Sequence, residues 1–209
     1  MNKITAIQIG KSRGKRVNVS LDGRFAFSLA AEVVLREGLH VGQELSAAEV
    51  EALAGTDRFH RCLNAALRYL SYRPRSEFEL KERLHRRGFD DDSMGAVLTR
   101  LKEQELVDDV AFAQFWKDNR ESFSPRSKRQ TGLELRRKGV DEDTIAQVVD
   151  VIDDDDSAYR AALGKARSLP LSDYQDFRQR LAGYLRRRGF SYGVINHAVE
   201  RVWQKQEVR

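Results

Sequence analysis

The 209-residue chain contains one cysteine, Cys62, and only three prolines and two tryptophans. A single cysteine excludes an internal disulfide framework and is typical of a protein from a reducing compartment. No apolar run approaches the roughly 20 residues that a membrane-spanning helix needs, and the N-terminus lacks the apolar segment of a secretory signal. Since 41% of the residues are hydrophobic and 33% are charged, we expect a soluble, cytoplasmic, globular protein.

Residues that carry enzymatic chemistry are scarce. The four histidines are isolated, and no His or Cys pair has the spacing of metal ligands. Cys62 has no CxxC partner and is typical of a small core residue. Residues 10–15, a basic run with two glycines, lack the first glycine of a phosphate-binding loop and are interpreted as a hairpin turn. Four aspartates at residues 153–156 favour a helix cap over a cation site. We therefore predict no enzymatic activity, no metal and no cofactor.

One short stretch occurs three times. It reads Leu-His-Arg-Arg-Gly-Phe at 84–89, Leu-Arg-Arg-Lys-Gly-Val at 135–140 and Leu-Arg-Arg-Arg-Gly-Phe at 185–190, so the glycines are 51 and 50 residues apart. A fixed period of this size indicates a repeat architecture. Each glycine suits a helix end with positive φ, after which the next apolar residue packs back on the leucine.

The likeness continues on both sides of the glycines. After each one, apolar residues recur at the spacing of one helix face. Before the first two, Pro74 to Ser76 and Pro125 to Ser127 stand at the same offset, and Ser76 with Glu79 forms a capping box. The repeated unit therefore contains a helix, a glycine stop and a second helix.

The first 56 residues differ from the repeats. Alternating apolar and polar residues flank Asp22-Gly23, which is the strongest short signal of a β-hairpin. A short helix is expected at 31–36, and Ser46 with Glu49 predicts a further helix start.

The predicted fold is mostly α, with tandem three-helix repeats in an elongated array and a small N-terminal β-hairpin extension. The expected parts are an N-terminal region at 1–56, a linking helix at 57–72, repeat one at 73–122, repeat two at 123–170 and a truncated, two-helix repeat three at 171–209.

Basic residues gather at equivalent places in the repeats. The net charge is +5, and clustered base indicates a polyanion or an acidic protein groove as partner. The plainer alternative is a solvated face whose cations complement the helix dipoles. The candidate partner- or DNA-binding residues are Arg86, Arg87, Arg126, Lys128, Arg129, Arg136, Arg137, Lys138, Arg186, Arg187 and Arg188. The acidic starts of the second helices at 90–92 and 141–143 disfavour a specific DNA-reading helix.

Residues 66–77, 84–89, 106–113 and 135–140 resemble the RecX family of recombination regulators, and the likeness extends in order over about residues 60–205. The resemblance implies three tandem three-helix repeats and a non-enzymatic modulator of RecA, and we expect a monomer. It implies binding in the helical groove of RecA filaments on single-stranded DNA, with inhibition of RecA ATPase, strand exchange and coprotease activity, and so a place in DNA repair and the SOS response.

The chain departs from the shorter family members in its first 56 residues. This extension either contacts RecA or DNA directly, or caps the array as terminal repeats require, and we favour capping slightly. Because the family has no short catalytic motif, the candidate residues rest on charge position alone. A protein that binds DNA by itself through basic three-helix modules is the alternative function.

Overall fold

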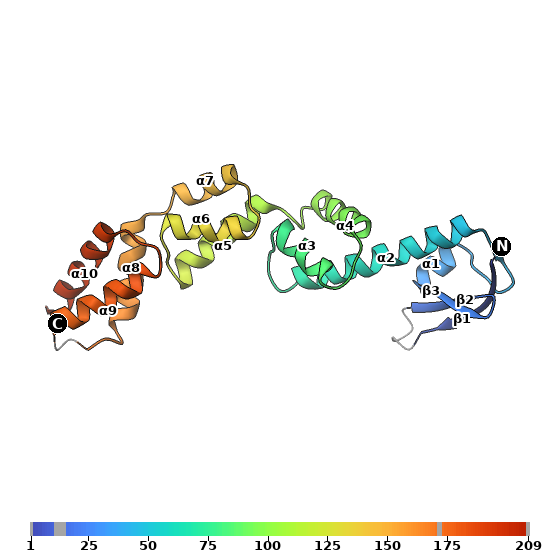
Figure 1. Ribbon diagram of the computed structural model, residues 1–209, viewed down its shortest axis with the longest axis horizontal. Helices are drawn as coiled ribbons and strands as arrows, with labels where there is room; N and C mark the ends of the chain where they lie inside the picture. Colours follow the sequence, from blue (N-terminus) through green and yellow to red (C-terminus); the bar gives the residue numbers. More distant parts are fainter. Residues whose placement is uncertain (1, 11–15, 171–172, 208–209) are drawn as a thin grey trace. The chain divides into compact units, whose positions relative to one another are not determined.

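A computed structural model describes residues 2–10, 16–170 and 173–207 (Figure 1). The chain forms two compact units. The first contains Met1–Arg73 and Leu80–Leu106, and the second contains Pro74–Glu79 and Val107–Arg209. The predicted basic turn at residues 10–15 falls mainly on residues 11–15, which lie outside the described part.

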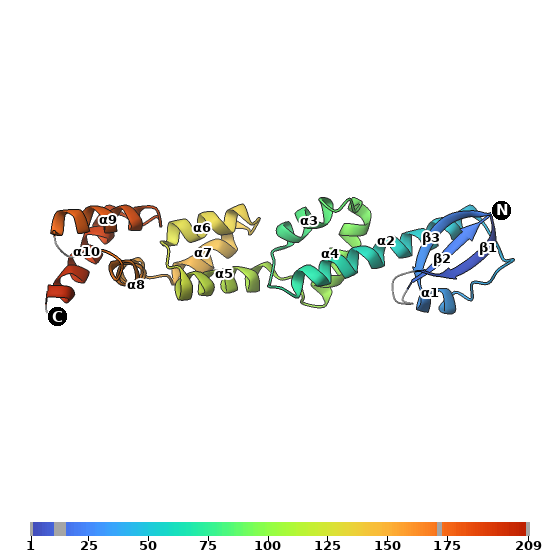
Figure 2. The same cartoon turned by 90° about the horizontal axis from the view of Figure 1, so that it is seen from below.

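The N-terminal hairpin is confirmed and is part of a larger antiparallel sheet. Its strands are β1 (Asn2–Ile9), β2 (Arg16–Leu21), β3 (Arg24–Ala30) and β4 (Glu44–Leu45), in the order β3-β2-β1-β4. Figure 2 labels the first three of these strands. Asp22 and Gly23 have φ of 48° and 80°, as the tight turn between β2 and β3 requires. Alternate residues of β2 face the core with those of β1 and β3, and α1 (Ala31–Arg36) adds Val33 and Val34.

A single long helix, α2 (Ala47–Leu70), leaves this sheet. It begins at the predicted capping box of Ser46 and Glu49, in which both reciprocal hydrogen bonds form. The separate linking helix predicted at 57–72 is wrong, since α2 continues through Gly55. An isolated glycine is tolerated in a helix interior when no other stop signal follows. The helix contacts β3 near its start and α4 (Asp91–Glu103) near its end.

The remaining helices fall into groups with separate cores. The helix α3 (Glu77–His85) begins in the second unit and continues from Leu80 in the first, where it and α4 bury the apolar residues predicted from the repeat. In the second unit, α5 (Asp109–Phe123), α6 (Lys128–Arg137) and α7 (Glu142–Asp150) share one core. A further core joins α8 (Asp154–Ala166), α9 (Tyr174–Arg186) and α10 (Tyr192–Glu207). The mostly helical fold is therefore confirmed.

The observed helix groups begin one helix earlier than the predicted repeats. The helices α5 and α8 were expected to close repeats one and two, yet Phe112 of α5 packs with Leu135 of α6, and Ala158 of α8 packs with Leu181 of α9. The last group therefore has three helices and is not truncated. The reason is that a periodic signal fixes a spacing but not the point at which each unit begins.

Each repeated glycine ends a helix as predicted. Gly88, Gly139 and Gly189 have φ of 80°, 77° and 89°. The amide of Val140 donates to the carbonyl of Leu135 at 3.2 Å, which is the long hydrogen bond of a Schellman turn. The helices α3, α6 and α9 thus each stop at a glycine with positive φ.

We predict that Gly139→Ala destabilises the second unit strongly. Positive φ costs an L-residue about 1–2 kcal/mol, and a Cβ at Gly139 would overlap the Phe78 side chain, which adds about 1–3 kcal/mol of overpacking. Gly164→Ala is the matched control, because that glycine lies inside α8 with no atom within 4 Å of the added Cβ. Urea unfolding followed by the fluorescence of Trp116 and Trp203, which both lie in the second unit, measures both variants. If Gly139→Ala and Gly164→Ala were equally stable, the positive φ and the close contact with Phe78 at Gly139 would be contradicted.

We also predict that Cys62 is unreactive in the folded protein. Its side chain is fully buried, and burial, with a smaller effect from the charge of Asp90, raises the pKa of the thiol to about 11. The thiolate is the reactive form, so labelling by a thiol reagent at pH 8 should be about a hundredfold slower than in urea, from the two-unit rise in pKa alone. Labelling of the folded protein at the rate of a free thiol would contradict the prediction, because it would show that the packing around Cys62 on α2 opens readily.

Candidate partner-binding surface

The aspartates near the basic clusters serve as helix caps. Asp90 accepts a hydrogen bond from the Ser93 amide at 2.8 Å, and Asp141 accepts one from the Thr144 amide at 2.8 Å. These bonds lower the pKa of both carboxyls. Asp153 caps α8 in the same way, which agrees with the expected cap. Within the described residues, no group of three or more His, Cys, Asp or Glu side chains is placed to hold a metal ion.

The position two residues before each glycine carries an exposed arginine in all three repeats. These residues, Arg86, Arg137 and Arg187, are called the repeated arginines below. Arg86 makes a surface ion pair with Glu82 at 3.0 Å. In the described part of the chain, no acidic group lies within 4 Å of the charged nitrogens of Arg137 or Arg187. Their guanidinium groups are therefore available to a partner.

The position one residue before the glycine points inward in the second unit. Lys138 forms an ion pair with Glu79, both side chains being 17% exposed, and its Nζ lies 4.0 Å from the centre of the Trp116 ring. The hydroxyl of Ser76 donates to the Lys138 carbonyl at 2.6 Å. Lys138 thus joins two segments that are distant in sequence, and it is not exposed as a partner-binding site would require.

Arg188 repeats this arrangement one period later. Its guanidinium donates to the Ser124 hydroxyl at 2.8 Å and to the Pro125 carbonyl at 3.2 Å, and it lies over the Tyr184 ring at 4.4 Å. The amide of Ser127 donates to the Arg188 carbonyl at 3.2 Å. Ser127 occupies the same place in its repeat as Ser76, so the second unit uses the same pair of positions twice, with the Ser76 hydroxyl as donor in one case and the Ser127 amide in the other.

The remaining candidates are likewise either exposed or half-buried. Arg126 pairs with the half-buried Glu134 at 3.0 Å, and Lys128 pairs with Asp150 at 3.4 Å. Arg136 is exposed but forms an ion pair with Glu142, which raises the pKa of the arginine and lowers that of the glutamate. The exposed candidates are Arg86, Arg87, Arg129, Arg136, Arg137, Arg186 and Arg187; the half-buried ones are Arg126, Lys128, Lys138 and Arg188.

A groove between α9 and α10 was missed by the sequence reasoning. It encloses about 640 Å³, and Arg186 is the one predicted candidate among its lining residues. Arg178, Tyr192 and Asn196 also line it. A hydrogen bond with Asn196 and the positive charge of Arg178 lower the pKa of the Tyr192 hydroxyl. The signal in the sequence was the helical spacing of arginine, glutamine and small residues along α9.

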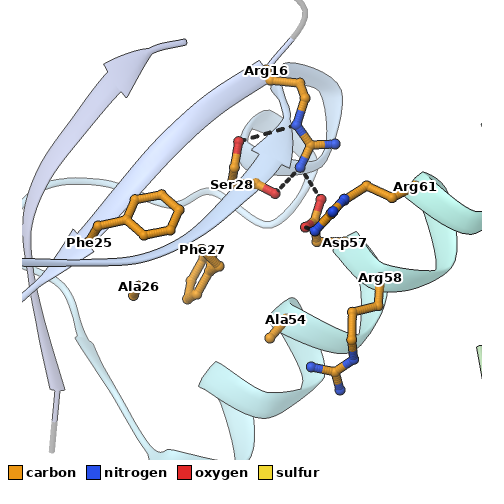
Figure 3. Close-up of a pocket in the computed structure, with 9 residues that line it drawn as sticks. All are labelled: Arg16, Phe25, Ala26, Phe27, Ser28, Ala54, Asp57, Arg58 and Arg61. Atoms are coloured by element: carbon orange, nitrogen blue, oxygen red, sulfur yellow. Dashed lines mark hydrogen bonds and ion pairs between the residues drawn. The ribbon is translucent and has the colours of Figure 1, made fainter. Parts of the chain in front are cut away.

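A second cavity, of about 420 Å³, lies between β3 and α2 and is also basic (Figure 3). The guanidinium of Arg16 points between Ser28 and Asp57 and bonds to both (Figure 3). Arg61 lies 3.9 Å from Asp57, and Arg58 lies 2.5 Å from Glu51. Each arginine here faces a carboxylate that neutralises its charge, so the cavity is not expected to attract an anion. The Arg16–Asp57 pair instead joins the sheet to α2.

We predict that Lys138→Met destabilises the second unit while Arg137→Met does not. Methionine keeps the apolar stem beside Trp116 but removes the half-buried ion pair with Glu79, which should cost about 1–3 kcal/mol after allowance for partial exposure. Arg137→Met removes an exposed charge and should cost less than about 0.5 kcal/mol. Urea unfolding measures the free energy of unfolding of both variants. A larger loss of stability in Arg137→Met than in Lys138→Met would contradict the assignment of Lys138 as the structural residue and Arg137 as the exposed one.

Over the part of the chain that the structure describes, α2 to α4, α5 to α7 and α8 to α10 form three groups of three helices, each with an outward arginine at one repeated position. This arrangement defines a tandem-repeat helical protein with a basic surface. None of the helices in the described residues is long and apolar enough to cross a membrane. Family models match four segments of the chain. They are the Regulatory protein RecX N-terminal domain at residues 2–46 and the first, second and third three-helix domains of RecX at residues 62–101, 108–149 and 153–199.

Relatives match along almost the whole chain. The Regulatory protein RecX of Clostridium perfringens is 31% identical over 207 residues, which cover 97% of each chain. That of Bacillus velezensis is 31% identical over 94% of this chain and 76% of its own. A crystal structure of regulatory protein RecX superposes with a TM-score of 0.65 and 25% identity, covering 98% of this chain and all of the other. A RecX structure from Lactobacillus salivarius, at 22% identity and TM-score 0.57, covers 70% of this chain and shares its fold. The chain belongs to the RecX family of regulatory proteins.

Proposed function

We propose that this protein is a non-enzymatic regulator that binds RecA filaments on single-stranded DNA and inhibits RecA ATPase, strand exchange and coprotease activity. The observation that carries the proposal is the exposure of the repeated arginines at one position in three successive repeats. A filament presents the same acidic or phosphate group again and again, so a repeated cation matches a repeated anion. The proposal places the protein in the cytoplasm, as a monomer.

Several weak contacts would supply the affinity. One exposed ion pair is worth about 0.2–1 kcal/mol, which cannot hold a partner alone. Once one repeat is bound, the next binds as an intramolecular event at a high effective concentration, so the contacts reinforce one another. Occupation of the filament groove would exclude a second DNA strand and coprotease substrates from the same space.

A stand-alone DNA-binding protein is the second candidate. The groove between α9 and α10 favours it, because two arginines and a tyrosine line this groove without an acidic residue. The two functions differ in their dependence on DNA concentration. A protein that acts only through DNA loses its effect on RecA when free DNA is in excess, whereas a filament-binding protein does not.

We predict that Arg137→Glu combined with Arg187→Glu weakens filament binding by about fivefold to several hundredfold. Each lost pair is worth about 0.2–1 kcal/mol, and charge reversal adds a repulsion of similar size. Binding is measured by biolayer interferometry on RecA filaments assembled over immobilised single-stranded DNA. The fold is checked by circular dichroism.

The matched control is Arg100→Glu combined with Arg167→Glu. This pair reverses the same number of charges at exposed positions, and Arg167 is the C-cap of α8 as Arg187 is the C-cap of α9, so the helix-dipole cost is similar. The control should bind within about twofold of the unchanged protein. An equal loss in both double variants would mean that net charge, and not the repeated position, governs binding.

A further inference from the structure

The groove between α9 and α10 has a lining of unusual composition. One face of α9 contributes residues at the spacing of successive helix turns, and residues at the start of α10 line it as well. Figure 1 shows where these two helices lie in the chain. The lining residues are Gln175, Arg178, Gln179, Ala182, Gly183, Arg186, Tyr192, Ile195 and Asn196. The lining combines small residues with long polar side chains.

The charge of this groove is not neutralised by its lining. Arg178 donates a hydrogen bond to the side-chain amide oxygen (Oδ1) of Asn196 at 3.4 Å, which is a neutral acceptor. No carboxylate of the described residues lies within 4 Å of the Arg186 guanidinium. The nearby acid Asp176 is instead paired with Arg180 at 2.8 Å, and neither of these two residues lines the groove. The cavity between β3 and α2 differs, because its arginines face carboxylates.

We propose that the groove between α9 and α10 binds a single strand of nucleic acid, with phosphates at Arg178 and Arg186 and a base on Tyr192. The guanidinium fork suits bidentate contact with phosphate oxygens. The two arginines are eight residues apart on one helix, or about 12 Å along its axis, so they reach separate phosphates of one strand. Tyr192 is 73% exposed, which leaves its ring free to stack.

The lining fits a single strand better than a duplex or an acidic peptide. A base stacks on an aromatic ring only when its face is free, as in a single strand. Amide side chains such as Gln179 and Asn196 both donate and accept, as base edges and sugars require. An acidic peptide would use the arginines but would leave Tyr192 and the amides without a role.

This site does not depend on the contact between the repeated arginines and RecA. It would operate in the protein alone, so its failure would leave the proposed filament binding untouched, and the reverse also holds. Within the proposed function it would add a contact with the DNA strand of the filament.

The test is fluorescence anisotropy of a labelled 15-nucleotide oligo-dT with the full chain, without RecA, at several salt concentrations. Arg178→Gln combined with Arg186→Gln should weaken binding at least tenfold and reduce the salt slope by about 1.4, since each phosphate contact on a single strand contributes about 0.7. Tyr192→Leu should weaken binding about five- to hundredfold with an unchanged slope, and Tyr192→Phe should restore it.

The control is Arg167→Gln combined with Arg180→Gln, which removes the same charge outside the groove and should bind within about twofold of the unchanged protein. An equal loss in the control would overturn the proposal. Displacement of the oligonucleotide by a ten-glutamate peptide at equal negative charge would also overturn it, because the groove would then be a general anion site.

A variant that fills the groove provides an independent test in case the double arginine variant does not fold. A Cβ at Gly183 meets only the Arg187 guanidinium, at 3.7 Å, so Gly183→Leu should fold and place an apolar side chain in the groove. We expect at least tenfold weaker oligonucleotide binding with an unchanged circular dichroism spectrum. Full binding by Gly183→Leu would contradict the assignment.

Discussion

The glycine turn at the end of each of the helices α3, α6 and α9 is the constraint on which the three-helix region depends. Positive φ at Gly88, Gly139 and Gly189 stops the helix within one residue and so fixes the direction of the side chains just before it. In the second unit, the residue next to the glycine turns inward, and its carbonyl meets the serine of the preceding repeat, as in Ser76 with Lys138. The arginine one position earlier turns outward. A single backbone geometry therefore builds the linkage within the unit and exposes the surface that we propose for the partner.

Much of the local structure could be predicted from the sequence because it depends on near neighbours. The Asp22-Gly23 turn, the Ser46 capping box and the three glycine stops involve residues that lie within a few positions of one another. The phase of the repeats could not be predicted in this way. The apolar stripe of α8 suits packing on either neighbour, and its contact with Leu181 and Val199 rather than with the preceding helices is a tertiary property. The continuity of α2 through Gly55 was missed for a similar reason, since both of its ends are held by packing on distant elements.

Charge alone identified the basic surface but could not distinguish its members. Arg137 and Lys138 are adjacent and carry the same charge, yet the first is exposed and the second lies against Trp116 and Glu79. The partner of Lys138 is 59 residues away in the sequence, so no local pattern reveals it. The groove of α9 and α10 was missed because Tyr192 and Asn196 join Arg178 and Arg186 only after the turn at Gly189 folds the two helices together. Predicting such a site requires the angle between helices as well as their periodicity.

The most direct test of the account is the ATPase activity of RecA on single-stranded DNA, titrated with this protein and repeated with a large excess of DNA. A regulator that binds the filament through its repeated arginines still inhibits ATP hydrolysis when DNA is in excess, because added DNA would occupy the groove between α9 and α10 and leave those arginines available to the filament. We predict this result. Inhibition that disappears as DNA is added would show that the protein only sequesters DNA, and it would contradict filament binding as the basis of its function.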